Sequence, residues 1–115
     1  MKRYMLVIEL KKEFIDKYCD IHRNAWPVLL DSIKSNGAKE LLIWNYKNLS
    51  LVYYECEDID KLYEKLNKLE VTKKWNVTVG PWFSSPIELD SAGNFITCEK
   101  IFDLNQQIAG KLEQF

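Results

Sequence analysis

Hydrophobic positions change their spacing several times along the chain, and each change marks a predicted element. Residues 3–10, RYMLVIEL, carry apolar side chains on both faces of an imperfect alternation and predict a first strand. Residues 12–25 change to a helical period, and one helix face collects Phe14, Ile15, Tyr18, Cys19, His22 and Trp26. Pro27 is expected to end this helix near Trp26 and to lie in the first turn of a second helix, where its missing N–H has little effect.

The middle of the chain predicts a β-hairpin. Gly37 supplies the stop of the second helix, because glycine readily adopts the left-handed conformation found at helix ends. Residues 39–46, KELLIWNY, and 49–56, LSLVYYEC, then predict two strands. Only Lys47 and Asn48 separate the two apolar runs, which indicates a tight two-residue turn.

The second half of the chain predicts two more helices and a final strand. Residues 58–69 are amphipathic, and residues 71–79 are expected to continue as a short helix. Proline, glycine and serine then mark a long loop that runs to Gly93. Residues 95–102, FITCEKIF, predict a fourth strand, and a short helix is expected after it, over 105–115.

The order strand, helix, strand, strand, helix, strand is that of a ferredoxin-like α+β fold, with helices on one face of an antiparallel sheet. The first hairpin strand is apolar on both faces, since Leu41 and Ile43 alternate with Leu42, Trp44 and Tyr46. Helices cover only one face, so a second copy of the sheet is expected to cover the other in a twofold dimer. The sequence therefore predicts a dimeric α/β barrel with a pocket between the two sheets.

Length and charge exclude several classes of protein. A chain of 115 residues is expected to form one domain, and its net charge of −1 comes from 16 basic and 17 acidic residues without a block of one sign. This balance argues against nucleic acid or an anionic membrane as partner. No apolar run reaches the roughly 20 residues of a membrane span, and the apolar N-terminal run is too short for a secretory signal. We therefore expect a cytoplasmic protein.

Residue types limit the chemistry further. The odd number of widely spaced cysteines, Cys19, Cys56 and Cys98, predicts free, buried thiols rather than disulfides or a metal site. A single histidine without clustered carboxylates argues against a transition-metal site. The four glycines form no phosphate-binding loop.

The single histidine, His22, has two interpretations that the residues alone leave open. Tyr18 lies four residues earlier, so both side chains lie on one helix face. His22 is then either an edge residue of the core, bonded to a backbone carbonyl, or a general acid or base, because its ordinary pKa near 6.5 suits proton transfer. A nucleophile pair of Cys19 and His22 is disfavoured, since nothing marks Cys19 as activated.

The chain resembles the L-rhamnose mutarotase family in a series of motifs. The segment that carries the resemblance most clearly contains Tyr18, His22, Trp26-Pro27, Leu29, Lys34-Ser35 and Gly37-Ala38. The likeness begins at the first strand, resumes at Val71 with a basic pair and Trp75, and ends at the segment CEKIFDL, so it covers most of the chain.

This resemblance implies a fold and an activity. Members of the family are dimeric α/β barrels of ferredoxin-like protomers, and they interconvert the α and β anomers of L-rhamnose without a cofactor. Residues 1–104 would be the mutarotase domain, and 105–115 a C-terminal extension. By the same resemblance His22 is the proton donor, and Tyr18 and Trp75 contact the sugar.

The chain departs from the family at two positions of the expected site. A sugar-binding tyrosine is common where this chain has Leu41, and a second tryptophan is common where it has Asn76. Trp44 is an expected substitute contact. The substrate is then L-rhamnose or a related 6-deoxyhexose such as L-fucose. The alternatives are a cofactor-free monooxygenase or isomerase on the same barrel, and a non-catalytic ligand-binding or dimerisation module.

Overall fold

An antiparallel sheet of three strands forms the centre of the part of the chain, residues 1–111, that the computed structural model describes. The strands lie in the order β1-β3-β2, with bounds β1 (Lys2–Glu9), β2 (Glu40–Tyr46) and β3 (Leu49–Cys56). The tight turn between β2 and β3 is present as expected. Lys47 has a φ of 53°, the left-handed conformation that two-residue hairpins favour.

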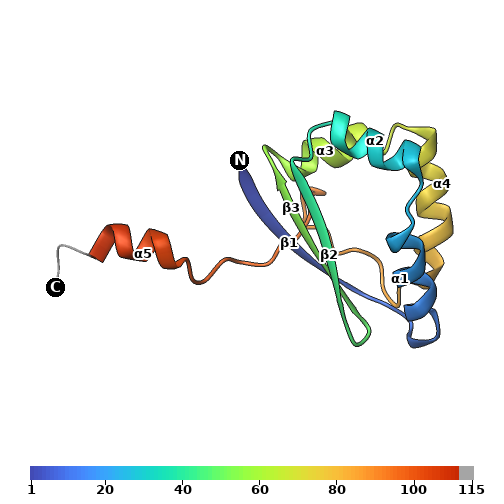
Figure 1. Ribbon diagram of the computed structural model, residues 1–115, viewed down its shortest axis with the longest axis horizontal. Helices are drawn as coiled ribbons and strands as arrows, with labels where there is room; N and C mark the ends of the chain where they lie inside the picture. The colour runs from blue at the N-terminus through green and yellow to red at the C-terminus, as the bar shows by residue number, and fades with distance from the viewer. Residues whose placement is uncertain (112–115) are drawn as a thin grey trace.

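The helices before and after the hairpin cover one face of this sheet, whereas the C-terminal helix lies on the opposite side (Figure 1). Their bounds are η1 (Lys12–Phe14), α1 (Ile15–Arg23), α2 (Pro27–Ser35), α3 (Ile59–Leu66), α4 (Glu70–Val79), η2 (Gly80–Trp82) and α5 (Leu104–Lys111). The expected corner at Trp26 and Pro27 is confirmed. Trp26 has extended backbone angles, and Pro27 lies in the first turn of α2.

The core lies between the inner face of the sheet and α3. Leu6 of β1 and Val52 of β3 pack with Ile59 and Leu62 of α3, and all four side chains are buried. Asp58 fixes the start of α3, because its carboxylate accepts hydrogen bonds from the backbone N–H groups of residues 60 and 61. This core holds the inner face of the sheet at a fixed distance from the helices.

The outer face of the sheet carries exposed apolar side chains, and no helix among residues 1–111 covers it. Trp44 and Tyr46 of β2 are 54% and 59% exposed to solvent, and Val7 and Leu42 are also exposed. This arrangement confirms that the helices cover one face only, as the two-sided apolar pattern of the hairpin indicated.

The prediction of a fourth strand over 95–102 is wrong, because the structure has no strand there. The segment is extended, but it makes only one backbone hydrogen bond to β1, from Cys98 N to Met5 O at 2.7 Å. The alternation of FITCEKIF suggested a half-buried strand, yet the side chains of Ile96, Ile101 and Phe102 are exposed. A strand needs a repeated ladder of hydrogen bonds, and the chain leaves the edge of β1 after this single contact.

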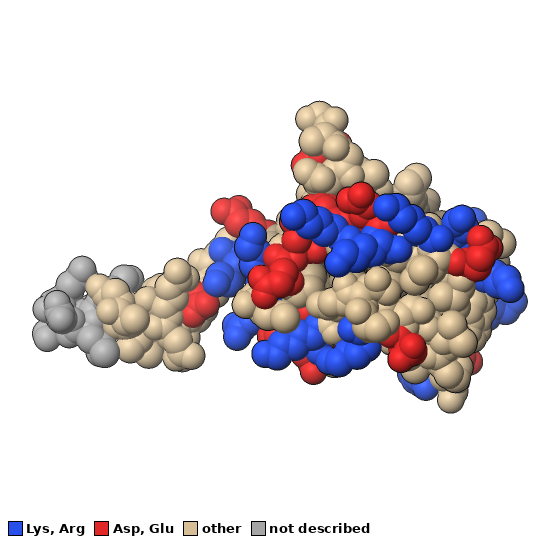
Figure 2. All heavy atoms as spheres, turned by 90° about the horizontal axis from the view of Figure 1, so that it is seen from above, with Lys and Arg blue, Asp and Glu red and all other residues tan. Residues whose placement is uncertain are grey.

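The segment beyond Cys98 forms an arm that projects from the sheet and ends in α5 (Figure 1). Part of the helix expected over 105–115 is thus confirmed, and residues 112–115 lie outside the described part. The arm exposes Ile101, Phe102, Leu104 and Ile108. In Figure 2, Lys and Arg are interspersed with Asp and Glu over the body.

Two further expectations concern membrane spans and cysteines. Among residues 1–111, no helix has both the length and the apolar character that crossing a membrane requires. All three cysteines are free, but only Cys56 is buried, whereas Cys19 is half-buried and Cys98 is exposed. The expectation of buried thiols is therefore correct for Cys56 and wrong for Cys98, which lies on the segment that does not join the sheet.

Candidate active site

A cavity of about 420 Å³ lies between the inner face of the sheet and helices α1 and α4. Its volume is in the range of small-molecule sites. The cavity lies within one protomer, on the helix side of the sheet, so the expected pocket between two sheets is not the site that the structure presents. Tyr18, His22 and Trp75, three of the expected site residues, all line this cavity.

Tyr18 is anchored at the wall of the cavity by a hydrogen bond to the sheet. Its hydroxyl and the Oγ of Ser50 on β3 are 2.7 Å apart, and both side chains are buried. Burial raises the pKa of the Tyr18 hydroxyl, although the bond to Ser50 acts in the opposite direction. Tyr18 is therefore a neutral hydroxyl at pH 7, held in one position by a partner from another element.

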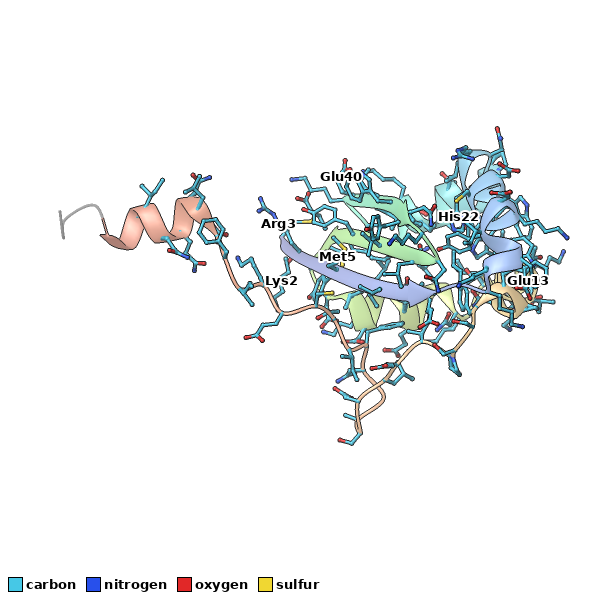
Figure 3. The ribbon with its side chains drawn as sticks, turned by 90° about the horizontal axis from the view of Figure 1, so that it is seen from below. Lys2, Arg3, Met5, Glu13, His22 and Glu40 are labelled. Atoms are coloured by element: carbon cyan, nitrogen blue, oxygen red, sulfur yellow. The ribbon has the colours of Figure 1, made fainter. Side chains whose placement is uncertain are left out.

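His22 lies one helical turn after Tyr18, on the side of α1 that faces the sheet (Figure 3). Its Nδ1 is 2.6 Å from the backbone carbonyl oxygen of Tyr18, and the two rings are in contact with centroids 4.1 Å apart and planes tilted by 39°. A carbonyl oxygen only accepts, so Nδ1 carries a proton, and Nε2 of the neutral ring has a free lone pair. Desolvation lowers the pKa of His22 below 6.5, more than the bond to the carbonyl raises it.

Trp75 on α4 closes the cavity on the other side of His22. The rings of Trp75 and His22 meet edge to face at 5.1 Å, and Trp26 meets Trp75 in the same geometry, also at 5.1 Å. Such contacts are favourable arrangements of aromatic rings. Trp26, which was expected only to form the corner of the chain, therefore also supports Trp75.

Of the other three expected contacts, two line the cavity and one does not. Leu41 on β2 and Asn76 on α4 line the cavity. Trp44 does not, because side chains alternate along a strand and Trp44 lies on the exposed outer face. Trp44 is therefore not part of this cavity, and its expected contact with the sugar stays a prediction.

A pair of tyrosines that the sequence did not single out also lines the cavity. Tyr54 on β3 lies directly opposite Leu41 of β2, and its hydroxyl is 2.5 Å from that of Tyr63 on α3. Burial raises the pKa of Tyr63 to about 12, and burial beside Tyr63 raises the pKa of Tyr54 as well. Both remain neutral at physiological pH and provide hydroxyl groups beside the apolar Leu41.

The residues that sequence reasoning missed are the partners of the expected ones. Ser50 is a polar residue between the apolar Leu49 and Leu51 of the strand LSLVYYEC, a signal that could have identified it as the partner of a buried hydroxyl. Tyr54 and Tyr63 belong to elements whose relative position only the fold provides. The assembled site combines one titratable imidazole, neutral hydroxyls and an indole ring, which suits proton transfer on a neutral, polar ligand.

The architecture and this site define a small α+β protein with a cavity that one histidine lines, and comparisons specify the family. The family model for L-rhamnose mutarotase matches residues 3–104. The chain belongs to the L-rhamnose mutarotase family, as the motifs around His22 indicated, and its activity is the carbohydrate isomerase reaction of that family. A comparison with curated proteins gives no match.

Solved structures with a similar fold include an L-rhamnose mutarotase from Formosa agariphila. It is 19% identical, with a TM-score of 0.68, over 90% of this chain and 99% of that one. A putative antibiotic biosynthesis monooxygenase from Nitrosomonas europaea is 14% identical, with a TM-score of 0.57, over 73% and 80% of the two chains. Tetracenomycin F2 cyclase from Streptomyces glaucescens is 13% identical, with a TM-score of 0.57, over 90% and 96%. At these identities the three structures establish a shared fold.

Proposed function

We propose that His22 carries out the proton transfers that interconvert the α and β anomers of L-rhamnose or a related 6-deoxyhexose. The observation that carries this proposal is the hydrogen bond from Nδ1 of His22 to the carbonyl oxygen of Tyr18. It leaves Nε2 as the ring nitrogen that can exchange a proton with a ligand in the cavity.

The reaction needs a base and then an acid at neighbouring oxygen atoms. Nε2 of neutral His22 takes the proton of the anomeric hydroxyl as the bond between C1 and the ring oxygen breaks. The resulting imidazolium donates that proton to the ring oxygen, which completes the open-chain aldehyde. Rotation about the C1–C2 bond and the reverse transfers close the ring on the other face of the aldehyde. Both oxygens are attached to C1, so one nitrogen can serve both, and no electron transfer takes place.

The cavity walls support a 6-deoxyhexose as the substrate. The face of Trp75 can stack on the apolar face of a pyranose ring, as aromatic side chains do with sugars. Tyr18 lies beside His22 and can contact a sugar hydroxyl, and Asn76 adds an amide group. Leu41 offers apolar surface, which suits the methyl group that a 6-deoxyhexose has in place of a hydroxymethyl group.

The protein is proposed to act as a homodimer. The uncovered outer face of the sheet, with Trp44 and Tyr46, is the type of apolar surface that monomers rarely expose. The arm exposes further apolar side chains, Ile101 and Phe102, on the same side of the sheet. A second copy would bury both surfaces in a twofold arrangement. The cytoplasmic location expected from the sequence stays a prediction.

Anomer exchange on a panel of aldoses tests the proposed reaction and its substrate. Saturation-transfer NMR on L-rhamnose should detect α–β exchange that increases with protein concentration, and L-fucose and D-glucose should define the range of substrates. Exchange at the uncatalysed rate for every sugar would contradict the proposal. In that case, oxygen consumption with an apolar aromatic substrate would indicate a monooxygenase, and sugar binding without exchange would indicate a binding module.

A further inference from the structure

Thr72 lines the cavity and has a buried hydroxyl group without a hydrogen-bond partner among the described residues. Its side chain is on α4, lines the cavity and is only 6% exposed. Among the described residues, Thr72 Oγ1 is the buried side-chain polar atom without a hydrogen-bond partner. A buried hydroxyl that makes no hydrogen bond is unfavourable, so such a group in a ligand cavity indicates a partner that arrives with the ligand.

The position of Thr72 in its helix explains why the backbone does not satisfy it. Threonine hydroxyls in helices often bond the carbonyl four residues earlier, and Thr78 does so with Lys74 O at 2.9 Å. Thr72 is in the first turn of α4, which begins at Glu70, so the residue four positions earlier, Lys68, lies outside the helix. The helix backbone therefore leaves the hydroxyl of Thr72 without a partner.

Thr72 also lies next to the residue expected to hold the sugar ring. It precedes Trp75 by three positions and Asn76 by four, so all three side chains lie on one face of α4, and all three line the cavity. Side chains three apart on a helix have Cβ atoms about 5–6 Å apart. A pyranose stacked on Trp75 would therefore bring its ring hydroxyls within reach of Thr72.

We propose that Thr72 is a specificity-determining residue that hydrogen-bonds one ring hydroxyl of the sugar. The inference rests on the proposed function, since it assumes that a monosaccharide occupies the cavity. Thr72 takes no part in the proton transfers, which His22 performs, so its hydroxyl acts on the binding of the sugar rather than on the chemical step.

Substitution by the isosteric valine separates a ligand contact from a structural one. In Thr72→Val we expect the dissociation constant and KM for the sugar to rise about 2- to 12-fold, the value of one neutral hydrogen bond, with kcat unchanged. The melting temperature of the sugar-free protein should stay the same or rise, because the variant removes an unpaired buried hydroxyl. Thr72→Ser keeps the hydroxyl and should restore most of the affinity. Thr78→Val is the matched control on the same helix and should leave KM unchanged.

Monodeoxy analogues of the sugar should then identify the hydroxyl that is bound. For the analogue that lacks the bound hydroxyl, the affinity of wild type should be lower than its affinity for the parent sugar. Thr72→Val should bind this analogue and the parent sugar equally well. Equal affinity of wild type and Thr72→Val for the parent sugar would overturn the inference, as would a marked loss of thermal stability in the sugar-free variant. Calorimetry measures affinity without relying on anomer exchange. A wild type that binds sugar without exchange contradicts the proposed reaction alone, while a wild type that binds no sugar overturns the Thr72 inference.

Discussion

The carbonyl oxygen of Tyr18 accepts a hydrogen bond of 2.6 Å from Nδ1 of His22, the residue that follows it by one turn of α1. Both partners belong to the same short helix, so the geometry of the helix brings the ring nitrogen to the carbonyl oxygen. The bond fixes the tautomer of neutral His22 and leaves Nε2 as the acceptor. In the proposed mechanism His22 therefore acts first as a base and then as an acid, which predicts a definite pH dependence.

The rate should depend on neutral His22 in the free enzyme. Burial lowers the pKa of His22 below 6.5, so the neutral form predominates at pH 7. We expect kcat/KM to rise with pH up to an apparent pKa below 6.5 and to stay level through neutral pH. Anomer-exchange rates measured by NMR at a series of pH values provide the profile. A rate that decreases as pH rises through this range would instead require imidazolium as the starting form.

Stability should depend on the same titration. The pKa of His22 is lower in the folded protein than in the unfolded chain. As pH falls below 6.5, the unfolded chain therefore binds a proton at His22 more readily than the folded protein does. The stability contributed by neutral His22 is therefore present above pH 6.5 and lost as pH falls from 6.5 toward the folded-state pKa. His22 is the only histidine, so the difference in unfolding free energy between wild type and His22→Gln isolates this effect. Denaturant titrations should give a difference that decreases as the solution becomes more acidic, and a difference that grows would contradict the lowered pKa.

The bond between Tyr18 and Ser50 should contribute to stability as well as to the site. Tyr18→Phe leaves the fully buried Ser50 hydroxyl without this partner, and a loss of about 1–3 kcal/mol in unfolding free energy is expected. Ser50→Ala removes the other partner. The double variant should lose less than the sum of the two single losses, because the two side chains share one interaction. Strict additivity in urea unfolding would show that the two hydroxyls act independently.

The outer face of the sheet should determine the oligomeric state. Trp44→Lys places a charge at the centre of the exposed apolar face, so it should convert the proposed dimer to a monomer without unfolding the protomer. Val28→Lys makes the same change at an exposed apolar residue of α2 and should leave the dimer intact. Analytical ultracentrifugation of both variants and wild type provides the comparison. Identical masses for wild type and Trp44→Lys would locate the interface elsewhere or exclude a dimer.

Local patterns in the sequence were sufficient for most elements of the fold. Trp26 and Pro27 mark a real corner, and the two-residue spacing between the apolar runs correctly placed the β2–β3 turn at Lys47. The segment 95–102 was misjudged because its alternation is also compatible with an extended arm. Whether such a segment joins a sheet depends on long-range hydrogen bonds, and here only Cys98 makes one to β1.

The site was predictable where it depends on one helix and less so where it depends on several elements. Helical spacing brought Tyr18 and His22 together, and the family resemblance added Trp75 from α4. Trp44 lies on the face of the sheet opposite this cavity, and its expected contact with the sugar stays a prediction. The buried state of Thr72 depends on how α4 is placed in the fold, and its sequence position gives no sign of it.

The most direct measurement of the central claim compares anomer exchange of L-rhamnose by wild type and His22→Ala, using saturation-transfer NMR. Loss of the acid–base group should reduce the catalysed rate about 10²–10⁴-fold. Circular dichroism and sedimentation should show that the variant keeps the fold and mass of wild type, so that the loss can be assigned to the imidazole. Exchange in His22→Ala at the wild-type rate would contradict the assignment of His22 as the proton-transfer residue.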